Sequence, residues 1–357
     1  MEKSKILLIG LGQCGCNLVD EMITKNKRYA GVFINSSIGD LANIKNANSN
    51  NTFTFNGTDG AGRNRKLAQS FIQDDIMRLS SFLTKFSQFK TMVLFSSLDG
   101  GTGSGSLPFM IKVVKKLFKD AVVNVIGVLP RLDEDKLKLD NTLDCLSELE
   151  PLLPHINSIR FIDNNTRDTY AEINSEALED FDLSYSIVGK HQEGNIDMQD
   201  SFNVNTAQGY TFTLRLPDRC VNLDEVVQVA KDSSVYALPD SFTCTYAGIN
   251  VKEGKYNVNE IKKKITSTNT VYTTYNDNKF NVVVLSGCAM PKDSIKLIEL
   301  ERDKREQELK NVGNPDLGFG LSTKATNNIS TQNTKENVIV SDDDISEDMF
   351  NADFFRL

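Results

Sequence analysis

The sequence predicts an α/β protein with five parts. These are a parallel sheet with helices on both faces, a long central helix, a second and smaller α/β unit, a C-terminal helix and an acidic tail. Short β-branched or aromatic runs alternate with amphipathic segments, which is the pattern of βαβ units. Two glycine-rich loops each follow such a run directly and precede a helix-like segment. The 357 residues suffice for about two domains with cores of their own.

The first half is predicted to form the parallel sheet. Strands are expected at Lys5–Ile9, Gly31–Asn35, Thr91–Ser97, Val122–Leu129 and Ser158–Ile162. The helices between them are expected at Cys16–Lys25, Arg63–Leu83 and Leu107–Phe118. Nearly continuous apolar strands indicate that helices cover both faces of this sheet.

The second half begins with a segment of helical periodicity. Apolar residues recur from Ile173 to Val188, which predicts one long helix ending at Gly189 or Gly194. Further strands are expected at Gln208–Leu216, Phe242–Asn250, Val271–Tyr275 and Asn281–Cys288, and further helices at Leu223–Lys231, Val258–Ile265 and Ser294–Lys310. The predicted boundaries are 1–168 for the first domain, 169–200 for the central helix and a following loop, 201–292, 293–312 and 313–357.

Charge and composition exclude several classes of protein. The chain has 40 basic and 48 acidic residues, a net charge of −8, which argues against direct DNA binding. Residues 313–357 hold eight acids and three bases, and their low hydrophobicity predicts a disordered tail. No apolar run reaches the ~18–20 residues of a membrane span, and the first residues lack the pattern of a signal peptide. Six cysteines without a CxxC pair argue against a zinc site or a disulfide framework, so we expect a cytoplasmic protein.

The two glycine-rich loops are the strongest chemical signal. The first covers Gly10–Asn17 (GLGQCGCN) and the second Asp99–Ser106 (DGGTGSGS). Glycine lets the backbone turn tightly and approach an anion closely, and the helix that follows offers unpaired N–H groups. Two facing loops of this kind can hold a polyphosphate, with Thr102 and Ser104 adding hydroxyl groups. The pattern therefore predicts a nucleotide site.

Two common nucleotide-binding classes do not fit these loops. The first loop matches GxGxxG, but a dinucleotide-binding unit needs an acid ~20 residues later at the end of the next strand. That strand ends at Asn35, followed by two serines, and the second loop would have no role. The sequence contains no GxxxxGK[ST], which excludes a P-loop NTPase. What remains is phosphate binding by backbone amides.

The loops resemble those of the tubulin/FtsZ superfamily. Residues 99–105 match the tubulin signature GGGTGSG in six of seven positions, with Asp99 in place of the first glycine. Residues 12–15 resemble the GQCG of tubulin, and residues 60–64 look like the third phosphate loop. The resemblance implies GTP or GDP as ligand, with Mg²⁺ but no particular metal-binding side chain. The implied phosphate-side residues are Gly12, Gln13, Cys14, Gly15, Asn17, Asn35, Gly60, Gly62, Gly100, Gly101, Thr102, Gly103 and Ser104.

Later motifs resemble the sugar and base contacts of the same superfamily. Residues 128–134 look like the sugar loop, so Glu134 is expected on the ribose; Lys138 stands where FtsZ usually has an arginine. Residues 162–164 look like the IDN of tubulin, which places Asn164 on guanine. Residues 169–174 (TYAEIN) are similar to TYGDLN, where the tyrosine stacks on the base and the asparagine pairs with its edge. These positions are Tyr170 and Asn174.

The base contact has an alternative. Residues 177–182 also resemble the base-contacting stretch of FtsZ, which would place Asp182 on the guanine. Asn174 is preferred because it lies 23 residues before Asp197, a spacing that suits the family.

Residues 195–200, NIDMQD, match the NxDxxD catalytic loop of FtsZ. Taken alone, Asp197 and Asp200 are typical helix N-cap residues, but their spacing from the base motif favours a catalytic role. The 21 residues from Asn174 to Asn195 would span ~30 Å as a helix. The two aspartates would therefore act on GTP held by a neighbouring subunit, and repetition of that contact gives an open head-to-tail filament.

Within the superfamily, the mixed motifs most resemble the TubZ group of phage- and plasmid-encoded filaments. That resemblance implies a GTPase that polymerises with itself and segregates DNA through a DNA-binding partition adaptor, bound by the tail or the filament surface. It implies location in the bacterial cytosol, without a membrane partner. Two alternatives are a cell-division GTPase of the FtsZ type and a paralogue that binds nucleotide without hydrolysing it, against which both aspartates argue.

Overall fold

The fold is built on one large sheet. The computed structural model describes residues 2–218, 223–277 and 279–312. In this part of the chain the ten strands of the large sheet follow the order β11-β10-β12-β9-β6-β5-β4-β1-β2-β3. They are β1 (Ile6–Leu11), β2 (Ala30–Asn35), β3 (Thr52–Thr54), β4 (Thr91–Ser97), β5 (Val122–Leu129), β6 (Ser158–Asp163), β9 (Gly209–Arg215), β10 (Cys244–Lys252), β11 (Ser267–Asn276) and β12 (Val282–Cys288).

The first six strands are all parallel to their neighbours. Every residue of β1 is buried, because helices cover both of its faces, as its unbroken apolar run predicts. The chain runs outward from β1 through β2 to β3 and then returns to β4 on the other side of β1. Ligands of open α/β sheets bind at such a reversal, outside the carboxyl ends of the strands.

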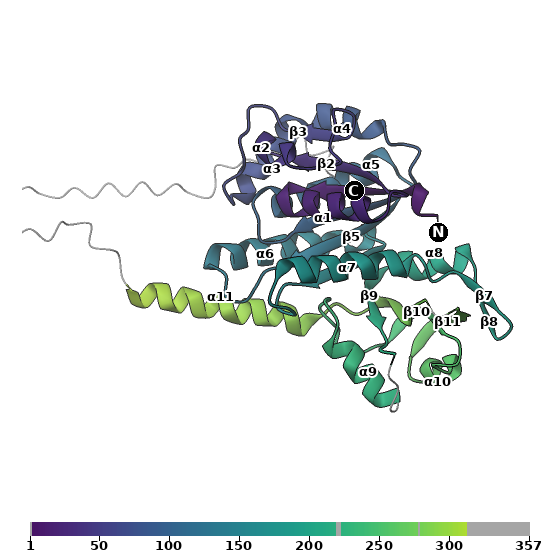
Figure 1. Cartoon of the computed structure of the whole chain (residues 1–357). Coiled ribbons are helices and arrows are strands. Elements are labelled where there is room, and N and C mark those ends of the chain that lie inside the picture. Colours follow the sequence, from purple (N-terminus) through teal and green to yellow (C-terminus); the bar gives the residue numbers. More distant parts are fainter. Residues whose placement is uncertain (1, 219–222, 278, 313–357) are drawn as a thin grey trace, which may run out of the picture.

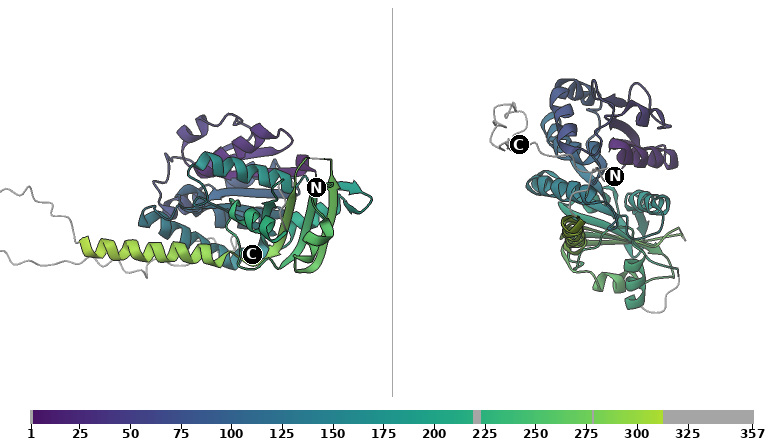
Figure 2. Two further views of the ribbon diagram at one scale, coloured as in Figure 1. Left: turned by 60° about the horizontal axis from the view of Figure 1, so that its bottom comes forward. Right: turned by 90° about the vertical axis from the view of Figure 1, so that its left-hand side faces the viewer.

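Helices lie on both faces of the sheet (Figures 1 and 2). Helices α1 and α7 pack together on one face, while α3 and α6 both pack against α5 on the other. Helix α11 packs on α6 and extends away from the body (Figure 1). Their bounds are α1 (Gly12–Lys25), α2 (Ile38–Ala42), α3 (Arg65–Asp74), α4 (Ile76–Thr84), α5 (Thr102–Leu117), α6 (Lys136–Leu149), α7 (Tyr170–Ser184), α8 (Met198–Thr206), α9 (Leu223–Asp232), α10 (Val258–Lys263) and α11 (Lys292–Val312), with 3-10 turns at Lys3–Lys5 and Glu150–His155.

The strands of the second half extend the same sheet. Strand β9 pairs with β6 in parallel, β12 and β10 follow in antiparallel, and β11 closes the edge in parallel. One hydrophobic core runs from β1 to α11, so the second α/β unit shares its core with the first. The boundaries at residues 168 and 200 stay a prediction. The expected acidic tail, 313–357, lies outside the described residues.

Four expected helices are wrong in extent. Helices α1 and α5 begin four and five residues before the expected starts at Cys16 and Leu107, so part of each glycine loop forms a first helical turn. The helix expected at 63–83 is two helices, because the carboxylate of Asp75 binds Asn56 and Arg78 and its backbone leaves the helical region at the junction. The central helix ends at Ser184. A hairpin of β7 (Gly189–His191) and β8 (Gly194–Ile196) follows it and packs against β11.

The apolar spacing beyond Ser184 comes from Tyr185, which is buried in the main core, and from Val188, which is 36% exposed, while the residues around Val188 pack into a small separate core. Ile187 and Ile196 are buried in it together with Val204, Val282 and Val284. Apolar residues in the irregular segment between the helix and the hairpin therefore continued the helical pattern of the sequence. Within the described part of the chain, no helix combines the length and the apolar character that crossing a membrane requires.

Candidate nucleotide-binding site

Three loops meet in a cavity of about 370 Å³ at the carboxyl ends of β1, β2 and β4. This is the edge of the sheet where the reversal of strand order predicts a ligand. The cavity is lined by Gly12, Gln13, Cys14, Asn35, Ser36, Asp40, Gly60, Ala61, Gly62, Arg63, Ser97, Asp99, Gly100, Gly101, Thr102, Gly103 and Lys138. Three loops that are remote in the sequence thus form one site.

Backbone contact between the loops requires glycine. Gly12 has a φ of +66°, and a Cβ added there would lie 2.8 Å from the backbone nitrogen of Gly103. A Cβ on Gly101 would lie 2.8 Å from the Cα and carbonyl carbon of Arg63. Both distances are shorter than side-chain carbons tolerate, so a side chain at either position would push two loops apart. The glycines therefore let the loops converge on one small volume.

Two of the helices that begin at this cavity, α1 and α5, have no side-chain cap on their first turns. Leu11 and Gly101 are the N-cap residues of α1 and α5, and neither supplies a side-chain cap. Side chains do cap α2, α3, α6, α7 and α8. The first N–H groups of α1 and α5 are thus left without a side-chain acceptor beside the cavity, together with the positive ends of two helix dipoles. This arrangement suits phosphate groups.

Most of the expected phosphate-side residues line the cavity, and three do not. Gly15 packs against the carbonyl oxygen of Phe95, where a Cβ would lie 2.1 Å away. The hydroxyl of Ser104 is buried and accepts a hydrogen bond from Arg65 Nε at 3.1 Å. Asn17 lies one helical turn beyond Gln13 on α1 and is exposed. Gly15 and Ser104 thus contact neighbouring parts of the protein rather than the cavity.

Tyr170 and Glu134 are joined at the rim of the cavity. The Tyr170 hydroxyl donates to Glu134 Oε1 at 3.3 Å, and Lys138 Nζ lies 2.7 Å from the same oxygen. Tyr170 is 45% exposed, and the Arg131 guanidinium lies over its ring at 5.8 Å from the centroid. Asn174 lies one turn further along α7, on the same side as Tyr170. The sugar and base motifs are therefore neighbours.

The two remaining candidates for the base contact differ in their surroundings. The Oδ1 atom of Asn164 is buried and has no hydrogen-bond partner in the described structure, which is unusual for a polar atom. Asp182 binds Lys3 Nζ at 2.6 Å and the Tyr29 hydroxyl at 3.0 Å. Lys3 precedes β1, so Asp182 lies at the opposite edge of the sheet from the cavity. The alternative that placed Asp182 on the guanine is therefore wrong.

Seven lining residues were not among the predicted site residues, namely Ser36, Asp40, Ala61, Arg63, Ser97, Asp99 and Lys138. Ser36, which follows β2, shares a hydrogen bond of 2.6 Å with the Thr102 hydroxyl and so ties the second strand to the second glycine loop. Asn35 donates to Asp40 at 3.1 Å. Arg63, the residue with a positive φ (65°) that is not glycine, pairs with Asp135 at 2.7 Å. Asp99 stands in the second glycine loop, and Lys138 follows the expected ribose contact Glu134 by four residues. Both residues were noted in the sequence as departures from the family motifs, but neither of them was assigned a contact with the ligand.

Asp197 and Asp200 form a reciprocal capping box at the start of α8. Asp197 accepts a hydrogen bond from the backbone of Asp200 at 2.8 Å, and Asp200 accepts one from the backbone of Asp197 at 3.0 Å. Both aspartates thus cap the start of α8, as their residue type predicts. Asp197 nevertheless remains exposed.

These aspartates lie at the amino edge of the sheet. Met198 and Val188 line a common hollow with residues 2–4, which precede β1. The glycine loops follow β1, whose six residues span about 20 Å between the two edges. Figure 1 shows α8 and the β7–β8 hairpin beside the N-terminus, at the far side from α2 and α3. Within one chain, the aspartates and the cavity therefore face opposite directions.

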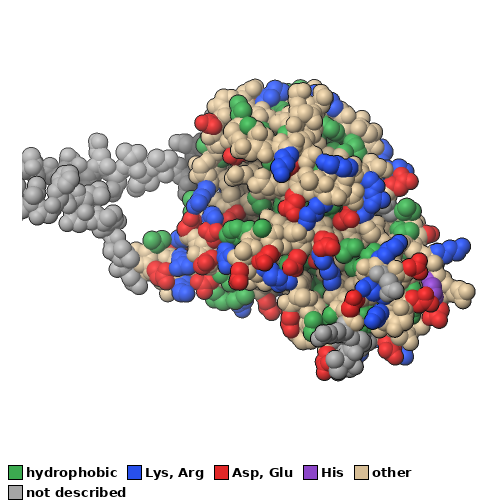
Figure 3. Space-filling view, viewed as in Figure 1, with side chains coloured by type: hydrophobic (Ala, Val, Ile, Leu, Met, Phe, Trp, Pro, Cys, Tyr) green, Lys and Arg blue, Asp and Glu red, His purple; other side chains and the backbone are tan. Residues whose placement is uncertain are grey.

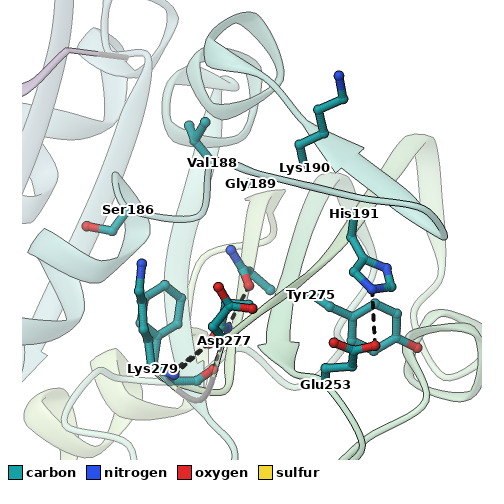
Figure 4. A pocket seen from close by; sticks show the side chains of 12 residues that line it. Ser186, Val188, Gly189, Lys190, His191, Glu253, Tyr275, Asp277 and Lys279 are labelled. Carbon is teal, nitrogen blue, oxygen red and sulfur yellow. Dashed lines mark hydrogen bonds and ion pairs between the residues drawn. The ribbon is translucent and has the colours of Figure 1, made fainter.

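A second cavity, of about 420 Å³, lies between the hairpin and the strands β10 and β11 (Figure 4). Its charged side chains include Lys190, Lys279, Glu253 and Asp277, and His191 lies 3.3 Å from Glu253. Among the described residues that line it, none belongs to the first turn of a helix or to a phosphate loop. The three-loop cavity is the better nucleotide site.

Comparison with known proteins agrees with this geometry. Residues 5–168 match the model of the Tubulin/FtsZ family, GTPase domain. The chain is 26% identical to the tubulin-like protein TubZ of Clostridium botulinum C phage over 99% of both chains. The solved structure of tail-truncated Clostridium botulinum phage c-st TubZ superposes with a TM-score of 0.78 at 25% identity, covering 86% of this chain and 99% of that one. The protofilament structure of Bacillus thuringiensis TubZ shares the fold, with a TM-score of 0.74 at 15% identity over 86% of this chain and 94% of that one.

Proposed function

Since residues 5–168 are a GTPase domain of the tubulin/FtsZ family and the likeness to TubZ spans the chain, we propose a GTP-dependent filament protein. Its subunits stack head to tail, and each completes the GTPase site of its neighbour. The observation that carries this proposal is the position of the phosphate loops and of Asp197 and Asp200 at opposite edges of one sheet. A contact between unlike edges repeats without closing and yields an open filament.

Exposed apolar side chains at both edges support the contact. Ile38, Leu67 and Leu137 are 67%, 41% and 49% exposed, and each lies in the first turn of a helix that begins at the cavity edge. At the other edge Met198 is 51% and Val188 is 36% exposed. Burial of such residues against a second copy would stabilise the filament. The Bacillus thuringiensis relative is described as a protofilament, which fits this proposal.

The chemistry follows from the parts of the site. Backbone amides of the glycine loops hold the phosphates, Glu134 accepts from the ribose hydroxyls, and Tyr170 with Asn174 and Asn164 holds the guanine. Asp197 and Asp200 of the adjoining subunit orient and polarise the water that attacks the γ-phosphate. Asp40 offers a carboxylate of the kind that holds phosphate-bound Mg²⁺, which would neutralise phosphate charge when bound.

The test of this function is phosphate release from GTP over a range of protein concentrations, with light scattering recorded in parallel. Specific activity should rise steeply above the concentration at which scattering begins, because the site is complete only between subunits. Specific activity that is constant with concentration would contradict hydrolysis between subunits.

The base platform gives a separate prediction. Tyr170→Ala should weaken GTP and GDP binding about tenfold or more, because stacking on an aromatic ring contributes ~1–3 kcal/mol per base. Tyr170→Phe keeps the ring and loses only the hydrogen bond to Glu134, so its affinity should stay close to that of the wild type. Fluorescence titration with labelled GDP measures both variants. Equal losses in both would show that the hydroxyl, rather than the ring face, matters.

We further propose that the filament segregates phage or plasmid DNA through a DNA-binding adaptor. The likeness to a phage TubZ supports this role. On the face seen in Figure 3 acidic and basic side chains are interspersed, so this face offers no basic stripe for DNA. The adaptor would bind the tail or the filament surface. No described feature favours the cell-division alternative.

The tail is expected to serve the adaptor rather than the GTPase. Deletion of residues 313–357 should leave GTP affinity within about twofold of the wild type, because the cavity is built from residues 12–138. The same titration checks this. A truncated protein that no longer binds GTP would contradict the boundary at residue 312.

A further inference from the structure

The cavity combines two departures from the family pattern. Asp99 replaces the first glycine of the second phosphate loop, and Lys138 replaces an arginine on α6. In the structure, Lys138 Nζ lies 3.6 Å from Asp99 Oδ2 and 2.7 Å from Glu134 Oε1. Both Asp99 and Lys138 line the cavity, and their side chains are only 18% and 20% exposed. The two departures are thus in contact within the candidate phosphate site.

The contact between Lys138 and Asp99 matters for a ligand because positive and negative side chains are balanced around the cavity. Among the lining residues described above, the cations are Arg63 and Lys138 and the acids are Asp40 and Asp99. Arg63 also pairs with Asp135, and Lys138 also pairs with Glu134. The cavity therefore has no excess of positive charge for a ligand with several negative charges. The carboxylate of Asp99 in particular would repel a phosphate, and repulsion is strong in a half-buried site.

A side chain of α6 also fixes the backbone at Asp99. Asn141 on α6, which is 5% exposed, donates from Nδ2 to the carbonyl oxygens of Asp99 at 3.1 Å and Arg63 at 3.0 Å. This clamp joins the second and third phosphate loops to the helix that carries Lys138. The ammonium group therefore stays close to the carboxylate. Although burial lowers it, the pKa of Lys138 is raised by its hydrogen bond to Glu134 and the charge of Asp99.

We infer that Asp99 and Lys138 act as one unit in GTP recognition: Lys138 cancels the charge of Asp99 and presents its ammonium group to the nucleotide phosphates. This inference rests on the proposed GTP site. Loss of the lysine alone leaves an unpaired carboxylate beside the phosphates, whereas loss of both charges restores a neutral cavity wall. GTP carries one phosphate more than GDP, so GTP binding should suffer more from the unpaired carboxylate.

The test is a double-mutant cycle on nucleotide affinity, measured by titration of the full chain with labelled GTP and GDP. Lys138→Met should weaken GTP binding about tenfold or more and GDP binding by less. Asp99→Asn alone should bind GTP at least as well as the wild type. The double variant should return to within about threefold of the wild type. Lys138→Arg keeps the charge and should bind like the wild type.

Lys136→Met is the matched control. Lys136 lies in the same first turn of α6 and pairs with Asp140 at 2.7 Å, but it does not line the cavity. Its GTP affinity should not change. The inference is overturned if Lys138→Met binds GTP normally, or if the double variant is as weak as Lys138→Met. A wild-type chain that binds neither nucleotide would instead overturn the proposed GTP site itself.

Discussion

Asp200→Asn should bind GTP with normal affinity and form filaments that persist, while phosphate release falls about 100-fold or more. The expected size is that of a lost group that activates the attacking water. Asp200 lies at the edge opposite the nucleotide cavity, so its own chain's affinity for GTP should not change. Filaments should persist because their subunits retain GTP. Phosphate release, nucleotide titration and sedimentation of filaments measure the three effects.

The choice of asparagine separates catalysis from helix capping. The carboxylate of Asp200 accepts a hydrogen bond from the backbone of Asp197, and an asparagine oxygen can accept the same bond. Asp200→Ala loses the bond as well and should cost about 1 kcal/mol of stability in addition. Asp197→Asn, at the N-cap itself, is the second variant of this kind. Normal GTP turnover in both asparagine variants would show that the aspartates cap α8 and take no part in hydrolysis.

Gly101→Ala should abolish measurable GTP binding and, with it, hydrolysis. The added Cβ would lie 2.8 Å from the Arg63 backbone and 2.9 Å from the Asn64 nitrogen, so the second and third phosphate loops must separate. We expect a loss of affinity of about 100-fold or more, since several backbone amides leave their positions at once. Titration with labelled GTP measures this loss.

Gly39→Ala is the control for this glycine. It lies in α2 near the cavity edge, and its added Cβ would meet only Ser37 Oγ, at 3.8 Å. Its affinity and stability should match those of the wild type. Circular dichroism of Gly101→Ala should show an intact fold, because the cavity lies at one edge of the sheet. GTP binding by Gly101→Ala at normal affinity would contradict the three-loop site.

The bounds of an element were predicted best where hydrophobicity alone marks the element in the sequence. The strands at Thr91–Ser97 and Val122–Leu129 have the expected bounds, because each is a mainly apolar run that ends at polar residues or proline. Helix α6 was missed although Leu139, Cys145 and Leu149 give it an apolar face, since charged residues surround its start. The central helix was extended too far because Tyr185 and Val188 continue its apolar spacing beyond Ser184, the last residue of the helix.

Sequence motifs predicted which loops form the candidate site, but not how its charged side chains pair. Gly12, Gly60 and Gly101 could be assigned to one cavity because each stands in a recognisable loop. The contact between Asp99 and Lys138 could not be predicted, because it depends on how α6 lies over the second loop. The alternative base contact at Asp182 stayed open in the sequence for a similar reason, since the direction of α7 decides which edge of the sheet that residue reaches.

The central claim is that GTP in one subunit is hydrolysed with the aspartates of another. Mixing Asp200→Asn with Gly101→Ala tests this most directly. The first variant keeps the cavity and the second keeps the aspartates, so one productive contact can form between them although neither protein is active alone. We predict that phosphate release reappears in the mixture and rises with the concentration of the Gly101→Ala protein. A mixture no more active than the sum of the two separate proteins would contradict the claim.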